Sequence, residues 1–373
     1  MGTKTEVVAG RPTDAAKEHR LVELRREAEH AGRVLAPGVR AGGGPMPQQA
    51  APPAASPSAG YYGLPLLKRP TWIWTIPLYF LVGGAAGAAA IIAAVARWTR
   101  GTDAPLVRDA RRIAIAGGAI SPILLIADLG RPSRFLNMLR VFKRQSPMSV
   151  GAWLLGSFNA AMTSAALFRR SGRSTDQRLL KRTATAASDA AEAAGAVLGG
   201  GMATYTGVLI GVTAVPVWAR NVRLLPFHFG MSGFSSASCL LELLHDDPAL
   251  HRINLTGAVG ETLVGMRLEC DRDRRQDPVK HGRSGTLIRL GGLLSGPAPL
   301  AIRLLAGQSR NARRSAALLS LAGSVVTRFA WLDAAQPSSE DPRIPLGLRP
   351  ADAPATEPHE LRSAISGVFN TTR

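Results

Sequence analysis

The chain has 373 residues and a formal net charge of +19, with 46% hydrophobic residues and a mean hydropathy of +0.07. Its Arg and Lys residues fall in short clusters between apolar blocks, which argues against a nucleic-acid-binding surface and is typical of the loops of a membrane protein. Two cysteines, Cys239 and Cys270, are too few for a disulfide framework or for a cysteine-ligated iron–sulfur cluster.

Two polar segments flank the apolar part of the chain. Residues 1–69 are rich in Ala, Pro, Gly and Arg; within them, 14–35 have helical propensity and alternating charge, whereas 36–60 form a Pro/Gly/Ala linker. We expect this tail to be disordered, with at most a short charged helix, and to carry no chemistry. Residues 1–30 contain no apolar stretch of the kind found in a cleavable signal peptide. Residues 336–373 form a second polar tail.

The intervening segment, 70–335, contains eight apolar blocks, and crossing a bilayer takes roughly 20 residues of helix. The blocks are 72–96, 110–128, 148–168, 188–212, 226–244, 254–269, 286–306 and 314–334. The sixth is short, and the seventh contains Arg289, Arg303 and several Gly and Pro residues. We predict an all-α polytopic membrane bundle of about eight transmembrane helices. Lys and Arg near the block ends divide almost evenly between the two sides, so the positive-inside rule does not orient it.

Two patterns inside the blocks predict how the helices sit. Trp72, Trp74 and Tyr79 at the start of the first block are expected to anchor it at the membrane interface. Small residues recur at four-residue spacing, which lets helix backbones approach closely in lipid. The pairs are Gly83 and Gly87, Gly195 and Gly199, and Gly207 and Gly211. The run of three glycines at 199–201 therefore predicts helix packing rather than a phosphate-binding loop.

Ionisable side chains within membrane helices are rare, and they are usually functional or paired. Here they are Asp128, Asp189, Glu192, His228, Glu242, Glu261 and Arg328. Asp189 and Glu192 lie three residues apart and so share a helix face, which makes them candidates for a proton path. The alternative is that both are solvated at headgroup level near Lys181 and Arg182. Glu261 and Arg328 are of opposite charge and similar depth, and could form a structural pair.

Five short motifs share their order and placement with a known family. They are "ADLGRPSRFLNML" at 127–139, "SPMSVGAW" at 146–153, "YTGVLIG" at 205–211, "VPVW" at 215–218 and "LPFHF" at 225–229. In these motifs the chain resembles the NrfD family, the membrane subunits of polysulfide reductase. The resemblance is strongest over 72–244. Over 254–334 it rests on the block count and on "TRFAW" at 327–331, and 1–69 lie outside it.

The resemblance implies a membrane anchor with no metal centre of its own. Such a subunit would sit in the bacterial cell membrane and pass electrons between a quinone, menaquinone or ubiquinone, and an extrinsic ferredoxin-like iron–sulfur subunit. That subunit would join it to a molybdopterin-type catalytic subunit. The two-cysteine count agrees with clusters carried by another chain.

Candidate quinone-binding residues follow from this expectation. Asp128 ends the second block, and Arg131 can pair with it across a turn made by Gly130 and Pro132. Tyr205 offers a phenolic hydroxyl in apolar surroundings, and Asn159 is a further candidate. The alternatives are a structural clamp between Asp128 and Arg131 and interhelical packing by Tyr205; clamp and quinone site can coexist.

The residues that follow are basic and aromatic. Arg134, Phe135 and Arg140 are candidates for docking the partner subunit. The motif at 146–153 is interpreted mainly as a helix start, with Ser146 as the N-cap and Pro147 at the first helical position.

A different class of function is a transporter or proton-translocating bundle without a redox role. It would use Asp189, Glu192, Glu242 and Glu261 as a relay, and it would show broken helices at corresponding places in two repeated halves. No clear repeat links the first four blocks to the last four, so the redox subunit is preferred.

Overall fold

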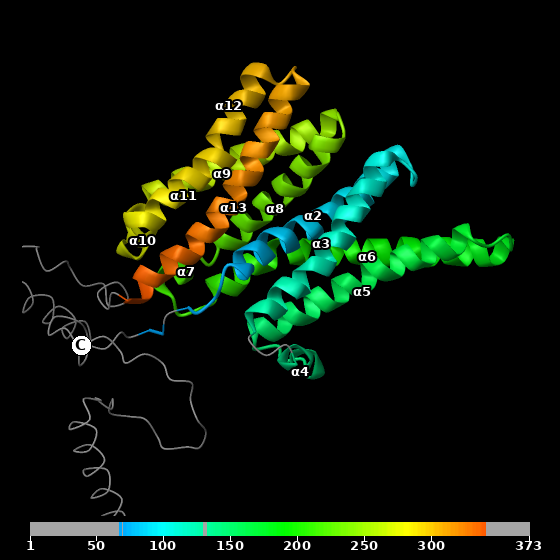
Figure 1. Ribbon diagram of the computed structural model, residues 1–373, viewed down its shortest axis with the longest axis horizontal. Helices are drawn as coiled ribbons and strands as arrows, with labels where there is room; N and C mark the ends of the chain where they lie inside the picture. The colour runs from blue at the N-terminus through cyan, green and yellow to red at the C-terminus, as the bar shows by residue number, and fades with distance from the viewer. Residues whose placement is uncertain (1–66, 69, 130–132, 341–373) are drawn as a thin grey trace, which may run out of the picture. The chain divides into compact units, whose positions relative to one another are not determined.

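The computed structural model describes residues 67–68, 70–129 and 133–340, without the side chains of Arg134 and Leu136 (Figure 1). Every regular element in these ranges is helical and no strand occurs in them, which confirms the all-α prediction. The charged helix expected at 14–35 lies outside the described residues, as does the chain after Glu340.

The first four apolar blocks form four long helices joined by short connections. They are α2 (Thr75–Arg100), α3 (Pro105–Asp128), α5 (Pro147–Arg173) and α6 (Arg178–Gly211), with the short α4 (Arg134–Arg140) between α3 and α5 and α7 (Pro216–Arg220) after α6. The start of α5 follows the predicted capping: the Ser146 hydroxyl accepts the Ser149 N–H at 3.4 Å, and Pro147 occupies the first turn, where its missing N–H costs nothing.

The second half is more interrupted. It comprises α8 (Leu224–Leu244), α9 (Pro248–Cys270), the 3₁₀ turn η2 (Arg274–Gln276), α10 (Asp277–Lys280), α11 (Gly282–Ser295), α12 (Pro297–Ala306) and α13 (Arg310–Glu340). Block seven, expected as one helix, is broken at Gly296, because its backbone leaves the helical region and Pro297 starts a new helix. The last helix, α13, continues through residues 336–340, which were expected to belong to the polar tail.

Five described helices are long and apolar enough to cross a membrane: α2, α3, α5, α6 and α13. The α8 and α9 helices have 21 and 23 residues, but they carry buried polar side chains that lower their hydropathy, among them His228, Glu242, Asn254 and Glu261. The α11 and α12 pieces, of 14 and 10 residues, are each too short. The helical membrane bundle is thus confirmed, whereas the count of eight spans is not.

The central element is α2, which packs against α3, α6, α8 and α13 (Figure 1, blue). Its glycines and alanines let neighbouring backbones approach, as the four-residue spacing predicts. A Cβ at Gly87 would overlap the carbonyl oxygen of Gly199 in α6, and a Cβ at Gly199 would overlap the carbonyl oxygen of Gly87. On the α8 side the approach is less close: a Cβ at Gly233 would lie 3.1 Å from the Gly84 carbonyl, and one at Gly84 would lie 3.8 Å from Gly233 Cα.

The contact between Gly87 and Gly199 predicts that Gly199→Ala lowers the stability of the bundle by about 3 kcal/mol, because α2 and α6 must separate to admit the methyl group. The matched control is Gly200→Ala, whose Cβ would meet only Ile91 Cδ1 at 3.8 Å. Both changes gain the same helix propensity, so their difference isolates the backbone contact. Thermal unfolding in detergent measures it. Equal melting temperatures for the two variants would contradict the close approach.

Candidate functional site

A narrow cavity lies where α2 and α5 begin and α3 and α6 end. Its walls are mainly aromatic and apolar, and include Trp72, Ile76, Tyr79, Phe80, Met138 and Met148. The lining residues from α2 are Ile76, Tyr79 and Phe80, and their helical spacing places them on one face of that helix. The cavity offers about 50 Å³ for the centres of water molecules, well below the roughly 300–1,000 Å³ of ordinary ligand pockets.

The expectation that Trp72, Trp74 and Tyr79 are interfacial anchors is wrong for Tyr79. That side chain is only 4% exposed and forms part of the cavity wall. Trp72 is half-buried and stacks on Trp218, with ring centroids 5.5 Å apart, while the Trp218 indole donates to the Trp331 carbonyl at 2.8 Å. Only Trp74, 62% exposed, is placed as an anchor would be. The helical spacing of Trp72, Ile76 and Tyr79 could have shown that Tyr79 faces inward.

Asp128, the last residue of α3, lines this cavity. Its carboxylate accepts the backbone N–H of Ile73 at 2.9 Å, which ties the end of α3 to the segment entering α2. Ile73 precedes the N-cap residue Trp74, so its N–H lies outside the α2 helix and finds its partner on α3. The proposed partner Arg131 lies outside the described residues, so the Asp128–Arg131 clamp stays a prediction.

Tyr205 of α6 lines the same cavity, and its hydroxyl donates to the Pro147 carbonyl at the start of α5. The ring packs closely against Gly151, where a Cβ would lie 2.8 Å from Tyr205 Cε1. The structure therefore brings Asp128 and Tyr205 together. It does not bring Asn159 to them, because the Asn159 amide donates to Leu155 of its own helix at 3.0 Å and its Oδ1 faces Gly118.

The two candidate proton-path residues share a face of α6, as predicted, and both contact Arg97 of α2. Glu192 is 2% exposed, so the solvated alternative is wrong for it. Arg111 of α3 binds its two oxygens at 2.6 and 2.7 Å, and Arg169 of α5 adds a contact at 2.8 Å. Four helices thus converge on one carboxylate.

Asp189 differs from Glu192 in its surroundings. Its side chain is 40% exposed and borders a surface hollow that it shares with Lys181 and Arg182, as the headgroup-level alternative expects. Arg97, Arg111 and Arg169 were not predicted as partners of Glu192, because each lies at the basic end of an apolar block and resembles part of an ordinary loop.

A second buried ion cluster joins α8, α9 and α12. Glu242 receives two bonds from Arg303, at 2.9 and 2.7 Å, and one from the Asn254 amide at 2.7 Å. The Arg303 side chain is completely buried and that of Glu242 is 3% exposed, with His251 Nδ1 3.8 Å from the carboxylate. Arg303, which made the seventh block look irregular, is therefore the counter-ion of a carboxylate in the fifth.

The expected Glu261–Arg328 pair takes another form. No ion pair joins these two side chains among the residues that the structure describes. Glu261 instead lies 3.3 Å from His228 Nδ1 and accepts the Ser295 hydroxyl at 3.2 Å. Arg328 donates to the Phe229 carbonyl at 3.3 Å and lies over the Phe229 ring, 4.0 Å from its centroid. Ring and carbonyl together stabilise the buried guanidinium.

The predicted docking residues lie on α4, beside the cavity end of the bundle. Arg140 is exposed and Phe135 is half-buried, while the side chain of Arg134 is outside the described residues. The next residues add an exposed Phe142, whose ring contacts Trp153 edge-on at 6.1 Å, and the basic pair at 143–144.

The family model described as "Polysulphide reductase, NrfD" matches residues 67–245. The match runs from the segment before α2 to the end of α8. It includes Asp128, Tyr205 and the Glu192 cluster, which is Glu192 with Arg97, Arg111 and Arg169. No curated protein gives a match. The resemblance inferred from the sequence motifs is confirmed over this range.

Proposed function

Through residues 67–245 the chain belongs to the NrfD family of membrane subunits of redox complexes, and we propose that it is the quinone-reactive subunit of such a complex in a bacterial cell membrane. It exchanges electrons between membrane quinone or quinol and an extrinsic iron–sulfur subunit. The observation that carries this proposal is the cavity in which Asp128 and Tyr205 share aromatic and apolar walls.

Quinol oxidation releases two protons with two electrons, so a headgroup site needs a proton acceptor and a hydrogen-bond donor. The Asp128 carboxylate supplies the acceptor, and the Tyr205 hydroxyl can turn from the Pro147 carbonyl to a quinone oxygen. Asp128 also lies at a helix end, where a proton has a short route to water. The aromatic walls match the flat faces of a quinone ring.

The cavity must widen to admit that ring. Met138 and Met148 border it, and unbranched methionine side chains change rotamer at low cost. Met138 lies on α4, which also carries the proposed docking residues Arg134, Phe135 and Arg140, and Met148 lies in the first turn of α5. Partner binding and cavity opening are therefore coupled in this proposal.

The proposed partners are a ferredoxin-like iron–sulfur subunit and a molybdopterin-type catalytic subunit. The exposed Arg140 and Phe142 give the docking surface both charge and apolar area. Co-purification of the tagged full chain, with identification of the bound subunits, tests this. Recovery of the chain without an iron–sulfur protein, from cells that express the neighbouring genes, would contradict it.

We expect Asp128→Asn and Tyr205→Phe to lower quinol-coupled electron transfer by about 10²-fold, the range of a lost proton-transfer group. Asparagine keeps an oxygen that can accept the Ile73 N–H, so Asp128→Asn leaves the helix tie in place. The measurement is quinol oxidation by the assembled complex, together with the membrane-inserted amount of the subunit.

A matched control is Asp109→Asn, which changes a carboxylate at the opposite end of α3, paired with His245 at 2.9 Å. Its quinol turnover should remain near wild type. Wild-type turnover by both Asp128→Asn and Tyr205→Phe would show that the quinone site lies elsewhere. The transporter alternative expects matching breaks in both halves, yet the break at Gly296 has no counterpart in the continuous α2, α3, α5 and α6.

A further inference from the structure

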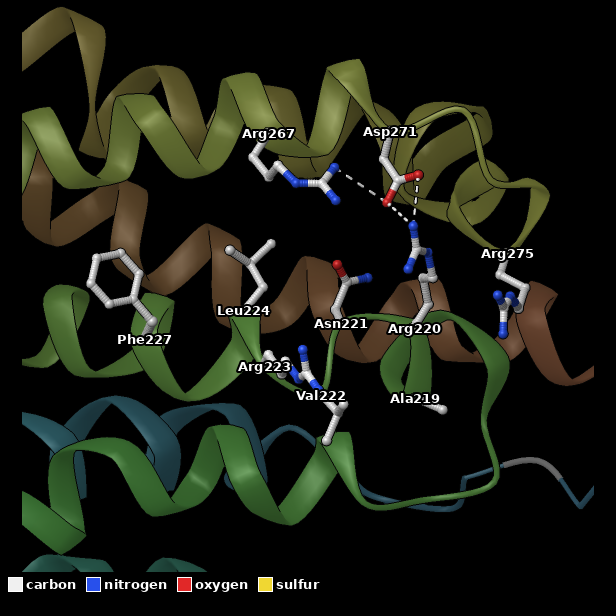
Figure 2. Close-up of a pocket in the computed structure, with 10 residues that line it drawn as sticks. All are labelled: Ala219, Arg220, Asn221, Val222, Arg223, Leu224, Phe227, Arg267, Asp271 and Arg275. Atoms are coloured by element: carbon white, nitrogen blue, oxygen red, sulfur yellow. Dashed lines mark hydrogen bonds and ion pairs between the residues drawn. The ribbon is translucent and has the colours of Figure 1, made fainter.

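A pocket of about 600 Å³ opens at the end of the bundle where α8 begins and α9 ends (Figure 2). It lies apart from the proposed quinone cavity and shares no lining residue with it. Its lining combines arginines with apolar side chains. The arginines are Arg220, Arg223, Arg267 and Arg275, and the apolar side chains include Val222, Leu224 and Phe227.

The arginines outnumber the carboxylates that face them. Arg220 pairs with Asp271 at 3.0 Å and Asp273 at 3.1 Å, Arg267 with Asp271 at 3.4 Å, and Arg275 with Asp273 at 2.7 Å. The hydrogen bond from Arg275 lowers the pKa of Asp273 to about 2, so that aspartate stays charged at neutral pH. Four positive charges then face two negative ones, and the pocket carries an excess of positive charge.

Arg223 is the charge without a local counter-ion. It is exposed, and no carboxylate in the described part of the chain pairs with it. Arg267 is 56% exposed, and its contact with Asp271 at 3.4 Å is longer than that of Arg220 at 3.0 Å. In Figure 2 the Arg267–Asp271–Arg220 contacts close one side of the pocket, and Arg223 lies across from Arg267. Two exposed arginines therefore line the same pocket, Arg223 at the start of α8 and Arg267 on α9.

The apolar side of the pocket continues onto the outer surface of the bundle. Phe227 of α8 is 55% exposed, and α9 exposes Val259, Leu263 and Met266 at 41, 56 and 53%. These three residues follow helical spacing and form one stripe that leads to Arg267. Gly257 packs on Ser235 and Gly260 on Met231, and this antiparallel register brings Phe227 beside the end of the stripe nearest Arg267.

We propose that this pocket binds the phosphate of an anionic phospholipid, with the acyl chains lying along Phe227 and the α9 stripe. Arginine suits a phosphate because its planar fork donates two hydrogen bonds at once. The pocket lies at the end of the bundle where the candidate span α6 ends, since Gly211 of α6 meets Val222 of the pocket lining. The ends of membrane-spanning helices lie at headgroup level, where basic pockets between helices bind acidic lipid headgroups. The continuity of the charged pocket with an apolar, outward-facing stripe favours a lipid over an acidic protein segment, which would require no such stripe.

The test is a native mass-spectrometry titration of the delipidated full chain with phosphatidylglycerol and, separately, with phosphatidylcholine. We expect tighter binding of phosphatidylglycerol to the wild type. Arg223→Gln/Arg267→Gln should weaken that binding about 30-fold, from roughly fivefold for each arginine near an anionic lipid. These two changes spare Arg220, whose bonds to Asp271 and Asp273 hold the loop.

The matched control, Arg272→Gln/Arg283→Gln, removes two exposed arginines that do not line this pocket. It should bind phosphatidylglycerol as the wild type does. Equal binding by wild type and pocket variant, or an equal loss in the control, overturns the proposal. So does inorganic phosphate binding as tightly as the lipid, which would indicate a free-anion site. If the pocket variant Arg223→Gln/Arg267→Gln binds phosphatidylglycerol as the wild type does but no longer co-purifies with other subunits, the pocket would be a protein-binding site instead.

Discussion

Glu192→Gln is expected to be among the most destabilising single substitutions in the chain. It leaves Arg97, Arg111 and Arg169 with only Asp189 as a counter-charge, and the Arg111 side chain is almost completely buried. Removing one partner from a buried ion cluster costs about 3–5 kcal/mol, because the remaining charge loses both water and its ligand. The penalty falls on the contacts among α2, α3, α5 and α6, the helices that also line the proposed quinone cavity.

The measurement is the melting temperature of the detergent-purified protein, which should fall by about 10 °C. A control with the same chemistry is Glu269→Gln, since Glu269 also binds an arginine through both oxygens, Arg289 at 2.6 and 3.1 Å, but on the surface. Exposed pairs contribute little, so this variant should unfold near wild type. Similar melting temperatures for the two variants would mean that the Glu192 cluster is not the junction between the helices.

Arg303→Met is the second substitution with a large expected effect. It strands the Glu242 carboxylate in the interior with Asn254 as its remaining close donor, and should cost about 3–5 kcal/mol. Glu242→Gln alone should also destabilise, because it strands the Arg303 guanidinium. In the double variant Glu242→Gln/Arg303→Met neither charge remains, and methionine fills much of the space of the arginine stem.

The double variant should therefore lose less stability than the sum of the two single variants, by about 1–3 kcal/mol of coupling. A thermal-unfolding cycle over the four proteins measures that coupling. Additive losses would show that Glu242 and Arg303 contribute independently, and would contradict the paired geometry. Because His251 lies close to both groups, the cycle is best run at fixed pH.

These ion clusters also affect the proposed proton path. Asp189 and Glu192 are predicted to lie on such a path, yet Glu192 is held by three arginines from three other helices. A carboxylate bound in this way supports the helix arrangement whether or not it carries protons. The stability of Glu192→Gln and its proton-coupled activity should be measured together, because loss of folding alone would lower both.

Much of the fold could be predicted from local pattern. The lengths of the apolar blocks, and the charged residues between them, predicted the positions of α2, α3, α5 and α6. Ser146 and Pro147 predicted the start of α5. The four-residue glycine spacing predicted close backbone packing, and the structure shows that Gly87 and Gly199 are the residues that meet. The motifs around Asp128 and Tyr205 also identified the two polar residues that line one cavity. Helix positions, caps and small-residue spacing depend on neighbours within a few turns of one helix, so the sequence alone determines them.

Only the tertiary structure decided which charges meet. Arg111 lies 81 residues before Glu192, and Arg303 lies 61 residues after Glu242. In the sequence each arginine looks like part of a basic loop or a flaw in an apolar block. Its role appears only when helices far apart in the chain pack together, because burial makes an unpaired charge costly and fixes its partner. For the same reason Glu261 came to lie beside His228 rather than Arg328, and Asn159 came to face α3 rather than the cavity.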